Sequence, residues 1–337
     1  MPSARSALLP PVDELLDGAH VVALPLRTRF RGIVVREALL VEGPRGWTEF
    51  SPFVEYLPAE AATWLAASVD FGWGAPHVAR VDTVRVNATL PAVGPDEVAG
   101  VLARFPGCRT VKVKVADRTQ TLADDVARVA AARRHVGPDG RVRIDANGGW
   151  SVDEAEEALL ALAPYALEYA EQPCATVPEL AELRRRTAGL GTLVAADESV
   201  RRADDPLAVA RAGAADLLVI KAQPLGGIRA ALEVVEAAGL PVVVSSALDT
   251  SVGLSTGAHL AAALPGLEHD CGLGTAALLA ADVTRQPLLP VDGAIEVRRV
   301  EVDRDLLREH AAPDERQRWW RDRLRACHDV LSATRDS

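Results

Sequence analysis

The segment Val111-Lys112-Val113-Lys114-Val115 alternates two lysines with three valines. In a β-strand, side chains two residues apart share a face, so both lysines are expected on one face and the valines on the other. An edge strand whose lysines prevent aggregation would explain this pattern. If the strand instead lines a closed barrel, the ammonium groups need carboxylates, a bound anion or water, because an unpaired buried charge is very costly. The segment therefore directs attention to acidic residues at the ends of other strands.

The composition of the chain is that of a folded protein without unusual segments. Its 337 residues allow one large domain or two of ordinary size, and 49% apolar residues suffice for a substantial core. A net charge of -10 argues against a nucleic-acid-binding surface. Four scattered cysteines without CxxC spacing indicate neither a zinc site nor a disulfide framework. No apolar run reaches the roughly 18 residues of a spanning helix. We expect a cytoplasmic protein that binds neither nucleic acid nor membrane.

The two ends of the chain are predicted to form a capping domain. Residues 21–26 and 33–41 are predicted strands, joined by a basic connection over residues 27–32, and residues 58–67 form a helix with proline near its start. Residues 1–83 therefore indicate a small α+β unit. In the C-terminal segment, 290–337, residues 294–302 are predicted to be a strand that returns to this unit. An amphipathic helix over residues 314–324 is expected to dock on the body through Trp319 and Trp320.

Between these ends, residues 84–289 alternate short β-branched runs with segments of helical period. Strands are predicted at 84–89, 110–115, 142–145, 167–171, 193–197, 217–221 and 242–245, with a degenerate eighth at 268–272. Helices are predicted at 121–135, 152–162, 177–187, 228–238 and 252–264. Regular alternation predicts a parallel sheet, and eight repeats fit a closed (β/α)₈ barrel of the α/β class. An open doubly wound sheet is the alternative, but no GxGxxG or Walker-type loop supports it.

Single polar residues follow the apolar runs of four consecutive predicted strands. Asp145 and Glu171 are 26 residues apart, Asp197 follows after another 26, and Lys221 after a further 24. This repeat is about one βα unit, so in a barrel the four side chains lie at the same mouth, where barrel enzymes carry their chemistry. We therefore predict that three carboxylates lie between the lysines of residues 111–115 and Lys221.

The residue types in this constellation indicate a metal-assisted proton transfer. Three hard oxygen ligands without histidine or cysteine suit Mg²⁺ better than zinc. Burial and neighbouring cations can pull a lysine pKa towards neutrality, which suits lysines for acid and base roles. The expected reaction is proton abstraction beside a carboxylate, with the metal stabilising the resulting enediolate. A lone strand-end aspartate is more often a helix N-cap, but five such residues in register favour a site.

Five motifs on these strands resemble those of the enolase superfamily, in its muconate-lactonising-enzyme subgroup. They are Lys112-Val113-Lys114, Asp145-Ala146-Asn147, Glu171-Gln172-Pro173, Asp197-Glu198-Ser199 and Ile220-Lys221. Within that subgroup, residues 29–32, 47–53, 245–253 and 272–275 are similar to the o-succinylbenzoate synthase family. The resemblance covers nearly the whole chain. It implies an enolase-like, modified TIM barrel with a split capping domain.

The resemblance also implies a reaction. It is the dehydration of 2-succinyl-6-hydroxy-2,4-cyclohexadiene-1-carboxylate, a dicarboxylate, to o-succinylbenzoate in menaquinone biosynthesis. Mg²⁺, for which Mn²⁺ can substitute, would be held by the three metal ligands Asp145, Glu171 and Asp197. Lys114 would abstract the α-proton and then protonate the departing hydroxyl, and the new aromatic ring would drive this second step. Lys221 would stabilise the intermediate as a cation over the ring, and Lys112 would orient the carboxylate.

Other residues are expected to support these groups. Asn147 is predicted to steady the metal site, and Glu198 to pair with a lysine. Ser246 and Leu248 follow the seventh strand, where family members contact the succinyl arm, often through backbone groups.

Three arginines lie on the predicted hairpin tip that would cover the barrel mouth: Arg27, Arg29 and Arg31. One of them could bind the succinyl carboxylate or order the lid, and Arg31 is the candidate for orienting the substrate. A solvated cluster explains each arginine equally well.

Three alternatives remain open. An N-succinylamino acid racemase would use the same metal and two opposed lysines, but racemising relatives tend to carry arginine where this chain has Pro224. A dipeptide epimerase is a second alternative. Such enzymes resemble one another in an Asp-x-Asp motif at the eighth strand, whereas the corresponding run here, Asp270-Cys271-Gly272, lacks the second acid. A non-catalytic barrel is disfavoured because all five key side chains are present.

A homo-oligomer is possible, since the helix of Trp319 and Trp320 could pack against a second chain.

Overall fold

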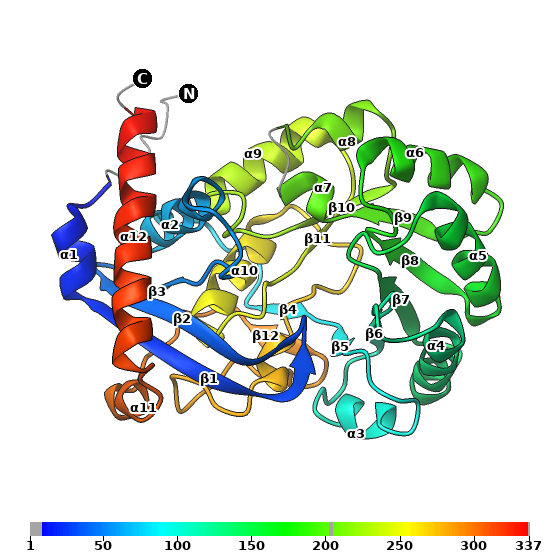
Figure 1. Ribbon diagram of the computed structural model, residues 1–337, viewed down its shortest axis with the longest axis horizontal. Helices are drawn as coiled ribbons and strands as arrows, with labels where there is room; N and C mark the ends of the chain where they lie inside the picture. Colours follow the sequence, from blue (N-terminus) through cyan, green and yellow to red (C-terminus); the bar gives the residue numbers. More distant parts are fainter. Residues whose placement is uncertain (1–8, 202–204, 336–337) are drawn as a thin grey trace.

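Seven parallel strands form one curled sheet in the computed structural model, which describes residues 9–201 and 205–335 (Figure 1). Their order across the sheet is β11-β10-β9-β8-β7-β6-β5, so each strand lies beside its neighbour in sequence. The strands are β5 (Ala88–Leu90), β6 (Thr110–Lys114), β7 (Arg141–Asp145), β8 (Leu167–Glu171), β9 (Leu193–Ala196), β10 (Leu217–Ile220) and β11 (Val242–Val244). This order is that of an α/β fold with a parallel sheet, and the strands from β6 to β11 lie close to their predicted ranges.

Helices follow the strands and cover the outside of the sheet (Figure 1). They are α3 (Val98–Leu102), α4 (Leu122–Val136), α5 (Val152–Leu162), α6 (Val177–Arg186), α7 (Glu198–Arg201), α8 (Ala208–Arg211), α9 (Ile228–Ala238) and α10 (Ser251–Ala263), with short 3₁₀ turns η1 (Ala163–Tyr165) and η2 (Thr275–Leu278). Capping boxes begin α4, α5 and α6, at Thr121, Ser151 and Thr176. In each, the side chain of the cap residue accepts from the backbone N–H of the third helical residue, whose own side chain accepts from the backbone N–H of the cap residue. These local signals explain why the helix starts were predictable.

Three predicted strands are wrong in extent. The run over residues 84–89 is divided into β4 (Thr83–Arg85) and β5, because β4 pairs antiparallel with β12 (Ala294–Glu296) and the chain then changes hydrogen-bond partner at Val86. The eighth strand is reduced to single bridges, in which Cys271 pairs with Val86 and Gly272 with Ser245. The strand predicted over residues 294–302 likewise contracts to the three residues of β12.

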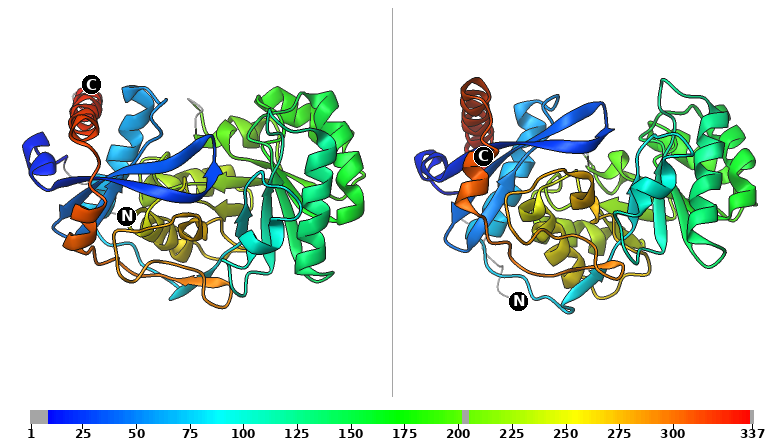
Figure 2. Two further views of the ribbon diagram at one scale, coloured as in Figure 1. Left: turned by 60° about the horizontal axis from the view of Figure 1, so that its bottom comes forward. Right: turned by 90° about the horizontal axis from the view of Figure 1, so that it is seen from below.

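The N-terminal region forms a separate antiparallel sheet in the order β1-β2-β3, from β1 (Ala19–Phe30), β2 (Ile33–Gly43) and β3 (Gly46–Phe50). The strand β3 was not predicted. The remaining helices are α1 (Val12–Asp17), α2 (Pro58–Trp73), α11 (Arg304–Glu309) and α12 (Asp314–Arg335). In Figure 2 the tip of the β1–β2 hairpin projects towards the parallel sheet, and this projection places residues 28–32 near the carboxyl ends of its strands.

The C-terminal helix α12 packs against α2 and β1, beside the N-terminal sheet (Figure 1). Trp320 is fully buried, lies edge-on to Phe50 with ring centres 5.9 Å apart, and donates from Nε1 to Glu37 Oε2 at 2.9 Å. The prediction that this helix docks on the body is confirmed. Trp319 is only partly buried.

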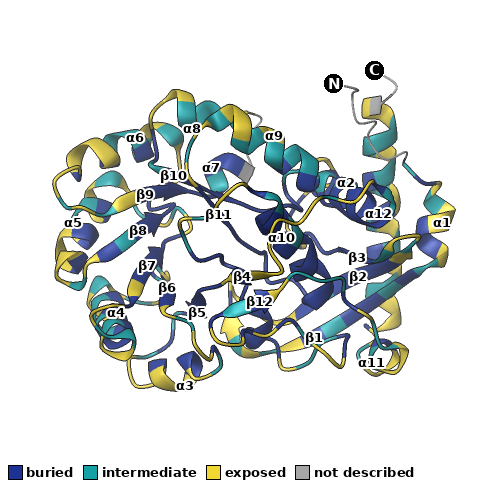
Figure 3. Ribbon diagram, turned by 180° about the vertical axis from the view of Figure 1, so that it is seen from behind, coloured by how far each residue is buried: buried dark blue, intermediate teal, exposed yellow. Residues whose placement is uncertain are grey.

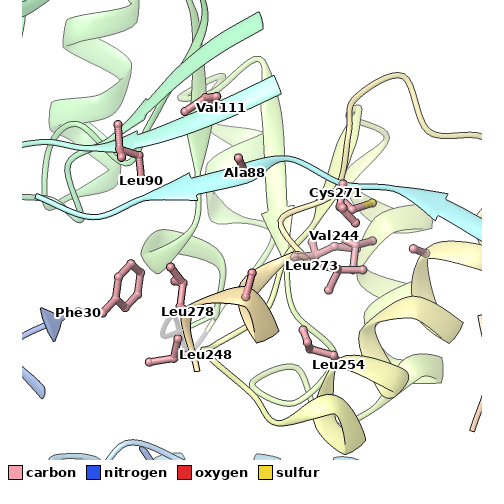
Figure 4. Close-up of a cluster of buried hydrophobic side chains, with 14 of the residues drawn as sticks. Phe30, Ala88, Leu90, Val111, Val244, Leu248, Leu254, Cys271, Leu273 and Leu278 are labelled. Atoms are coloured by element: carbon pink, nitrogen blue, oxygen red, sulfur yellow. The ribbon is translucent and has the colours of Figure 1, made fainter. Parts of the chain in front are cut away.

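The strands of the parallel sheet are largely buried and the outer faces of the helices around it are exposed, as Figure 3 shows. One apolar cluster extends from the parallel sheet to the hairpin, so that Phe30 belongs to the same cluster as Leu248 and Leu278 (Figure 4). All four cysteines are free thiols. None of the described helices is long and apolar enough to cross a bilayer.

Candidate active site

The predicted acids and lysines meet at the carboxyl ends of β6 to β10. Lys114 lies opposite Asp145, and Asp145 opposite Glu171, in the registers of neighbouring strands. Asp197 and Lys221 come directly after β9 and β10. The three carboxylates are each only 1% exposed. Parallel strands end at a common edge, and this explains why residues so regularly spaced in the sequence converge.

The two lysines of β6 contact different sets of carboxylates. Lys112 Nζ lies 2.9 Å from Glu171 Oε1 and 3.0 Å from Asp145 Oδ2, between the two acids. Lys114 Nζ lies 2.5 Å from the same Asp145 oxygen and 2.8 Å from Asn147 Oδ1. The lysines therefore share a face of the strand and a common acid, as the alternation with valine predicts.

Lys221 donates to Asp197 Oδ2 from the opposite side of the site. The backbone N–H of Asp197 is held by Gln172 Oε1 at 2.9 Å, and the Nε2 of the same glutamine donates to Ser199 Oγ at 2.7 Å. Gln172 is fully buried and has a left-handed backbone with φ 38°. No role was predicted for Gln172, although its place directly after Glu171 is a signal that could have suggested one.

Burial and charge shift the pKa values of these groups in different directions. Burial disfavours the charged form of Lys112, but Asp145 and Glu171 outweigh it and hold its pKa well above the usual range. Burial, together with the charge of Lys112, lowers the pKa of Lys114. The expectation of a lowered lysine pKa thus agrees with Lys114 and not with Lys112. Burial and the charge of Asp145 raise the pKa of Glu171 to about 7, while the two lysines lower that of Asp145 despite its burial.

The donor set is suited to a hard divalent cation, since three buried carboxylates supply only oxygen atoms. Among residues 9–201 and 205–335, no three His, Cys, Asp or Glu side chains already converge as metal ligands. The ammonium groups of Lys112 and Lys221 lie against these carboxylates instead. By their chemistry and their common location, the three carboxylates fit a hard divalent cation.

Asn147 connects the metal-binding candidates to Glu198. Its backbone N–H donates to Asp145 Oδ1 at 3.1 Å, and its Nδ2 donates to Glu198 Oε1 at 3.2 Å. Because Lys114 donates to the same Asn147 side chain, Glu198 is linked to a lysine through the amide. Direct pairing of Glu198 with a lysine stays a prediction.

A pocket opens beside these groups. It is lined by Phe30, Arg31, Phe53, Trp64, Thr89, Lys112, Lys114, Asp145, Asn147, Asp197, Glu198, Lys221, Pro224, Ser245, Ser246, Ala247, Leu248, Gly272 and Thr275. The aromatic wall formed by Phe53 and Trp64 of the N-terminal region was not predicted. Ser246 Oγ is already bonded to Gly272 O at 2.9 Å and to Thr275 Oγ1 at 2.8 Å, so its side chain is held by the protein.

The three hairpin arginines have different surroundings. Arg31 lines the pocket, with its guanidinium 4.3 Å from the ring centre of Phe53. Arg29 lines a neighbouring outer groove together with Lys114 and residues 115–119. Arg27 donates from Nε to Leu279 O at 2.9 Å and lines neither. Of the three, Arg31 is thus placed to meet a bound molecule.

Comparison with known proteins agrees with this geometry. Residues 95–301 match the family described as "Enolase C-terminal domain-like" and residues 21–72 match "Enolase N-terminal domain-like". The o-succinylbenzoate synthase of Mycobacterium marinum is 55% identical over 321 residues, covering 95% of this chain and 96% of that protein. That of Mycobacterium tuberculosis is 54% identical over 325 residues, covering 96% and 98%. The chain belongs to the o-succinylbenzoate synthase family of the enolase superfamily. Like the members of this family it is an enzyme of the lyase class.

Solved structures show the same fold at lower identity. The muconate lactonizing enzyme from Pseudomonas putida superposes with a TM-score of 0.71 at 20% identity, covering 87% of this chain and 98% of that one. An N-succinyl Arg/Lys racemase from Bacillus cereus gives 0.72 at 19%, covering 88% and 97%. These likenesses show that the fold is shared, and Pro224 lines the pocket of this chain.

Proposed function

We propose that this enzyme dehydrates 2-succinyl-6-hydroxy-2,4-cyclohexadiene-1-carboxylate to o-succinylbenzoate, with Mg²⁺ as cofactor, in menaquinone biosynthesis. One observation carries the proposal: the Lys114 and Lys221 side chains line the same pocket as two of three buried carboxylates, in a member of the o-succinylbenzoate synthase family. Mg²⁺ held by Asp145, Glu171 and Asp197 would supply electrostatic stabilisation of the negative charge that develops on the substrate carboxylate.

The chain's own residues can perform both proton transfers. Lys114 Nζ lies at the pocket wall and takes the proton from the carbon beside the carboxylate. The protonated Lys114 then gives this proton to the departing hydroxyl, so that water leaves and the ring becomes aromatic. Lys112, held as a cation between two acids, orients the substrate carboxylate. Lys221 faces the intermediate as a second cation, an interaction worth about 2 kcal/mol when desolvated.

The far end of the pocket is proposed to hold the succinyl arm of the substrate. Arg31 offers a charged group for its carboxylate, and residues 246–248 line the same pocket as the lysines. Because Ser246 Oγ is engaged within the protein, backbone groups of this wall are the expected contacts.

We also propose that the curled sheet closes as a (β/α)₈ barrel. Cys271 N donates to Arg85 O at 2.8 Å and Gly272 N to Val244 O at 2.8 Å, so one short segment bonds to both sides of the opening. Residues 84–289 would form this barrel, with residues 1–83 and 290–337 as the capping domain.

The proposed function is tested by two assays run side by side. An ultraviolet assay follows dehydration of the cyclohexadiene with Mg²⁺, and polarimetry follows N-succinyl amino acids, with kcat/KM measured for each. We expect fast dehydration that EDTA abolishes and that Mg²⁺ or Mn²⁺ restores, with negligible racemisation. Absence of dehydration, or racemisation of higher efficiency, would overturn the proposal.

A further inference from the structure

Three ionisable side chains are buried together where the N-terminal sheet meets the loop after β11. Arg36 from β2 and Glu49 from β3 are each 3% exposed, and Asp249 from the loop is 1% exposed. They take no part in the proposed chemistry. Burying charges is costly unless they are paired, so a cluster of this kind calls for an explanation other than simple stability.

Each of the three side chains binds a different backbone group of residues 246–250. Arg36 Nε donates to Leu248 O at 3.1 Å. Asp249 Oδ2 accepts from Ala247 N at 3.2 Å, and Glu49 Oε2 accepts from Thr250 N at 3.2 Å. The middle residue of this loop, Leu248, has a left-handed backbone with φ 63°, which is unfavourable for a leucine and persists only when its surroundings hold it.

The cluster is also connected internally. Ser51 Oγ accepts from Arg36 Nη2 at 2.9 Å and donates to Glu49 Oε1 at 2.5 Å. Glycine at position 253 allows the two acids to approach, because a Cβ there would lie 2.7 Å from Asp249 Cβ and 2.8 Å from Glu49 Oε2. Burial and the charge of Asp249 raise the pKa of Glu49 to about 7, while Arg36 opposes this shift. The acids are thus held close together, with one guanidinium to compensate them.

The loop that these groups hold is the pocket wall. Ser246, Ala247 and Leu248 line the pocket, and the arm of the proposed substrate would lie against them. We propose that Arg36, Glu49 and Asp249 are positioning residues that fasten this wall to the N-terminal sheet and so set its fit to the succinyl arm. The inference rests on the proposed function for the identity of the ligand and on the backbone contacts for the role of the cluster.

The test compares Arg36→Met with a matched control. Asp70 on α2 is also buried, and it joins the N-terminal region to α9 by accepting from Ile228 N at 3.0 Å, but it contacts none of residues 246–250. We expect Arg36→Met to raise KM for the cyclohexadiene by roughly tenfold or more, as for loss of a charged hydrogen bond, with kcat within about threefold. Asp70→Asn should lower the melting temperature and leave KM unchanged. Arg36→Lys keeps the positive charge and should therefore raise KM less than Arg36→Met does.

Hydrogen exchange provides a readout that does not depend on turnover. In Arg36→Met the amides of residues 247–250 should exchange faster than in the wild type, whereas Asp70→Asn should leave them protected. Glu49→Gln keeps the shape of the side chain and serves if Arg36→Met does not fold. Unchanged exchange, or a fall in kcat with unchanged KM, would overturn the inference. An inactive wild type with the expected exchange pattern would overturn the proposed function alone.

Discussion

Lys112 and Lys114 are two residues apart on one strand, yet their surroundings give them different properties. Lys112 lies between two carboxylates, which keep it charged, and its own charge helps to lower the pKa of Lys114. A base must release a proton readily, whereas a group that orients a carboxylate must stay cationic. These surroundings support the proposed roles of Lys114 as the base and Lys112 as the cation that orients the carboxylate.

The first prediction concerns Lys114. Lys114→Ala should reduce kcat by roughly a hundredfold to ten-thousandfold, the range of general acid–base effects, because it removes the group proposed to take the proton. Steady-state ultraviolet kinetics measure the effect, and an unchanged circular dichroism spectrum shows that the fold is intact. Near-normal activity would exclude Lys114 as the base.

At the scale of elements, the β1–β2 hairpin connects the N-terminal sheet to the pocket. Its Phe30 joins the apolar cluster of the parallel sheet, and the Nζ of Lys114 lies 5.4 Å from the centre of the Phe30 ring. One hairpin thus supplies both an apolar cover for the lysine and the arginine that lines the pocket.

The second prediction separates the arginines of this hairpin. Arg31→Ala should raise KM about tenfold, because it removes a charged group proposed to bind the substrate carboxylate. Arg27→Ala should leave KM unchanged, since Arg27 bonds only to a backbone carbonyl outside the pocket. Both variants are compared by steady-state kinetics. Equal effects on KM would mean that the hairpin acts as a whole and not through Arg31.

For the whole molecule, the C-terminal helix α12 contributes to stability by burying Trp320 against the N-terminal sheet. Trp320→Ala should lower the free energy of unfolding by about 3–5 kcal/mol, the usual cost of removing a fully buried tryptophan. Trp319→Ala should cost less, because Trp319 is only partly buried. Urea unfolding measures both. Equal losses would show that α12 is not held mainly by Trp320.

Glu168, Arg143 and His269 form a hydrogen-bonded ion-pair network at the parallel sheet, away from the candidate active site. We expect this network to contribute to stability in acid. His269, Arg143 and their hydrogen bonds outweigh burial and lower the pKa of Glu168 to about 2. A lowered carboxyl pKa contributes stability above the unfolded value of about 4.3 and loses it as the pH falls through about 2. Glu168→Gln should therefore lower the free energy of unfolding by on the order of 3 kcal/mol at pH 6.

The difference in the free energy of unfolding between the wild type and Glu168→Gln should be smaller at pH 3.5 than at pH 6, by more than about 1 kcal/mol. Urea unfolding at both pH values measures it. Glu233 is exposed on α9, and Glu233→Gln is the control. Its difference in the free energy of unfolding from the wild type should be the same at both pH values. A constant difference for Glu168→Gln would contradict the prediction.

Most of the sheet and the central constellation were predictable because they depend on local information. Alternating valines, capping boxes and a repeat of about 26 residues are properties of short segments, and parallel strands bring every repeat to the same edge. Asp145, Glu171, Asp197 and Lys221 could therefore be placed together without knowledge of distant contacts.

Only the tertiary structure determined the pocket wall and its support. Arg36 and Glu49 lie some 200 residues from the loop of Leu248 that they hold, and the break at Val86 depends on pairing with the distant strand β12. No local pattern records such pairings, because they result from how segments far apart in the chain pack together. The sequence by itself determined which chemistry the chain carries, whereas long-range packing decided the shape of the space in which that chemistry takes place.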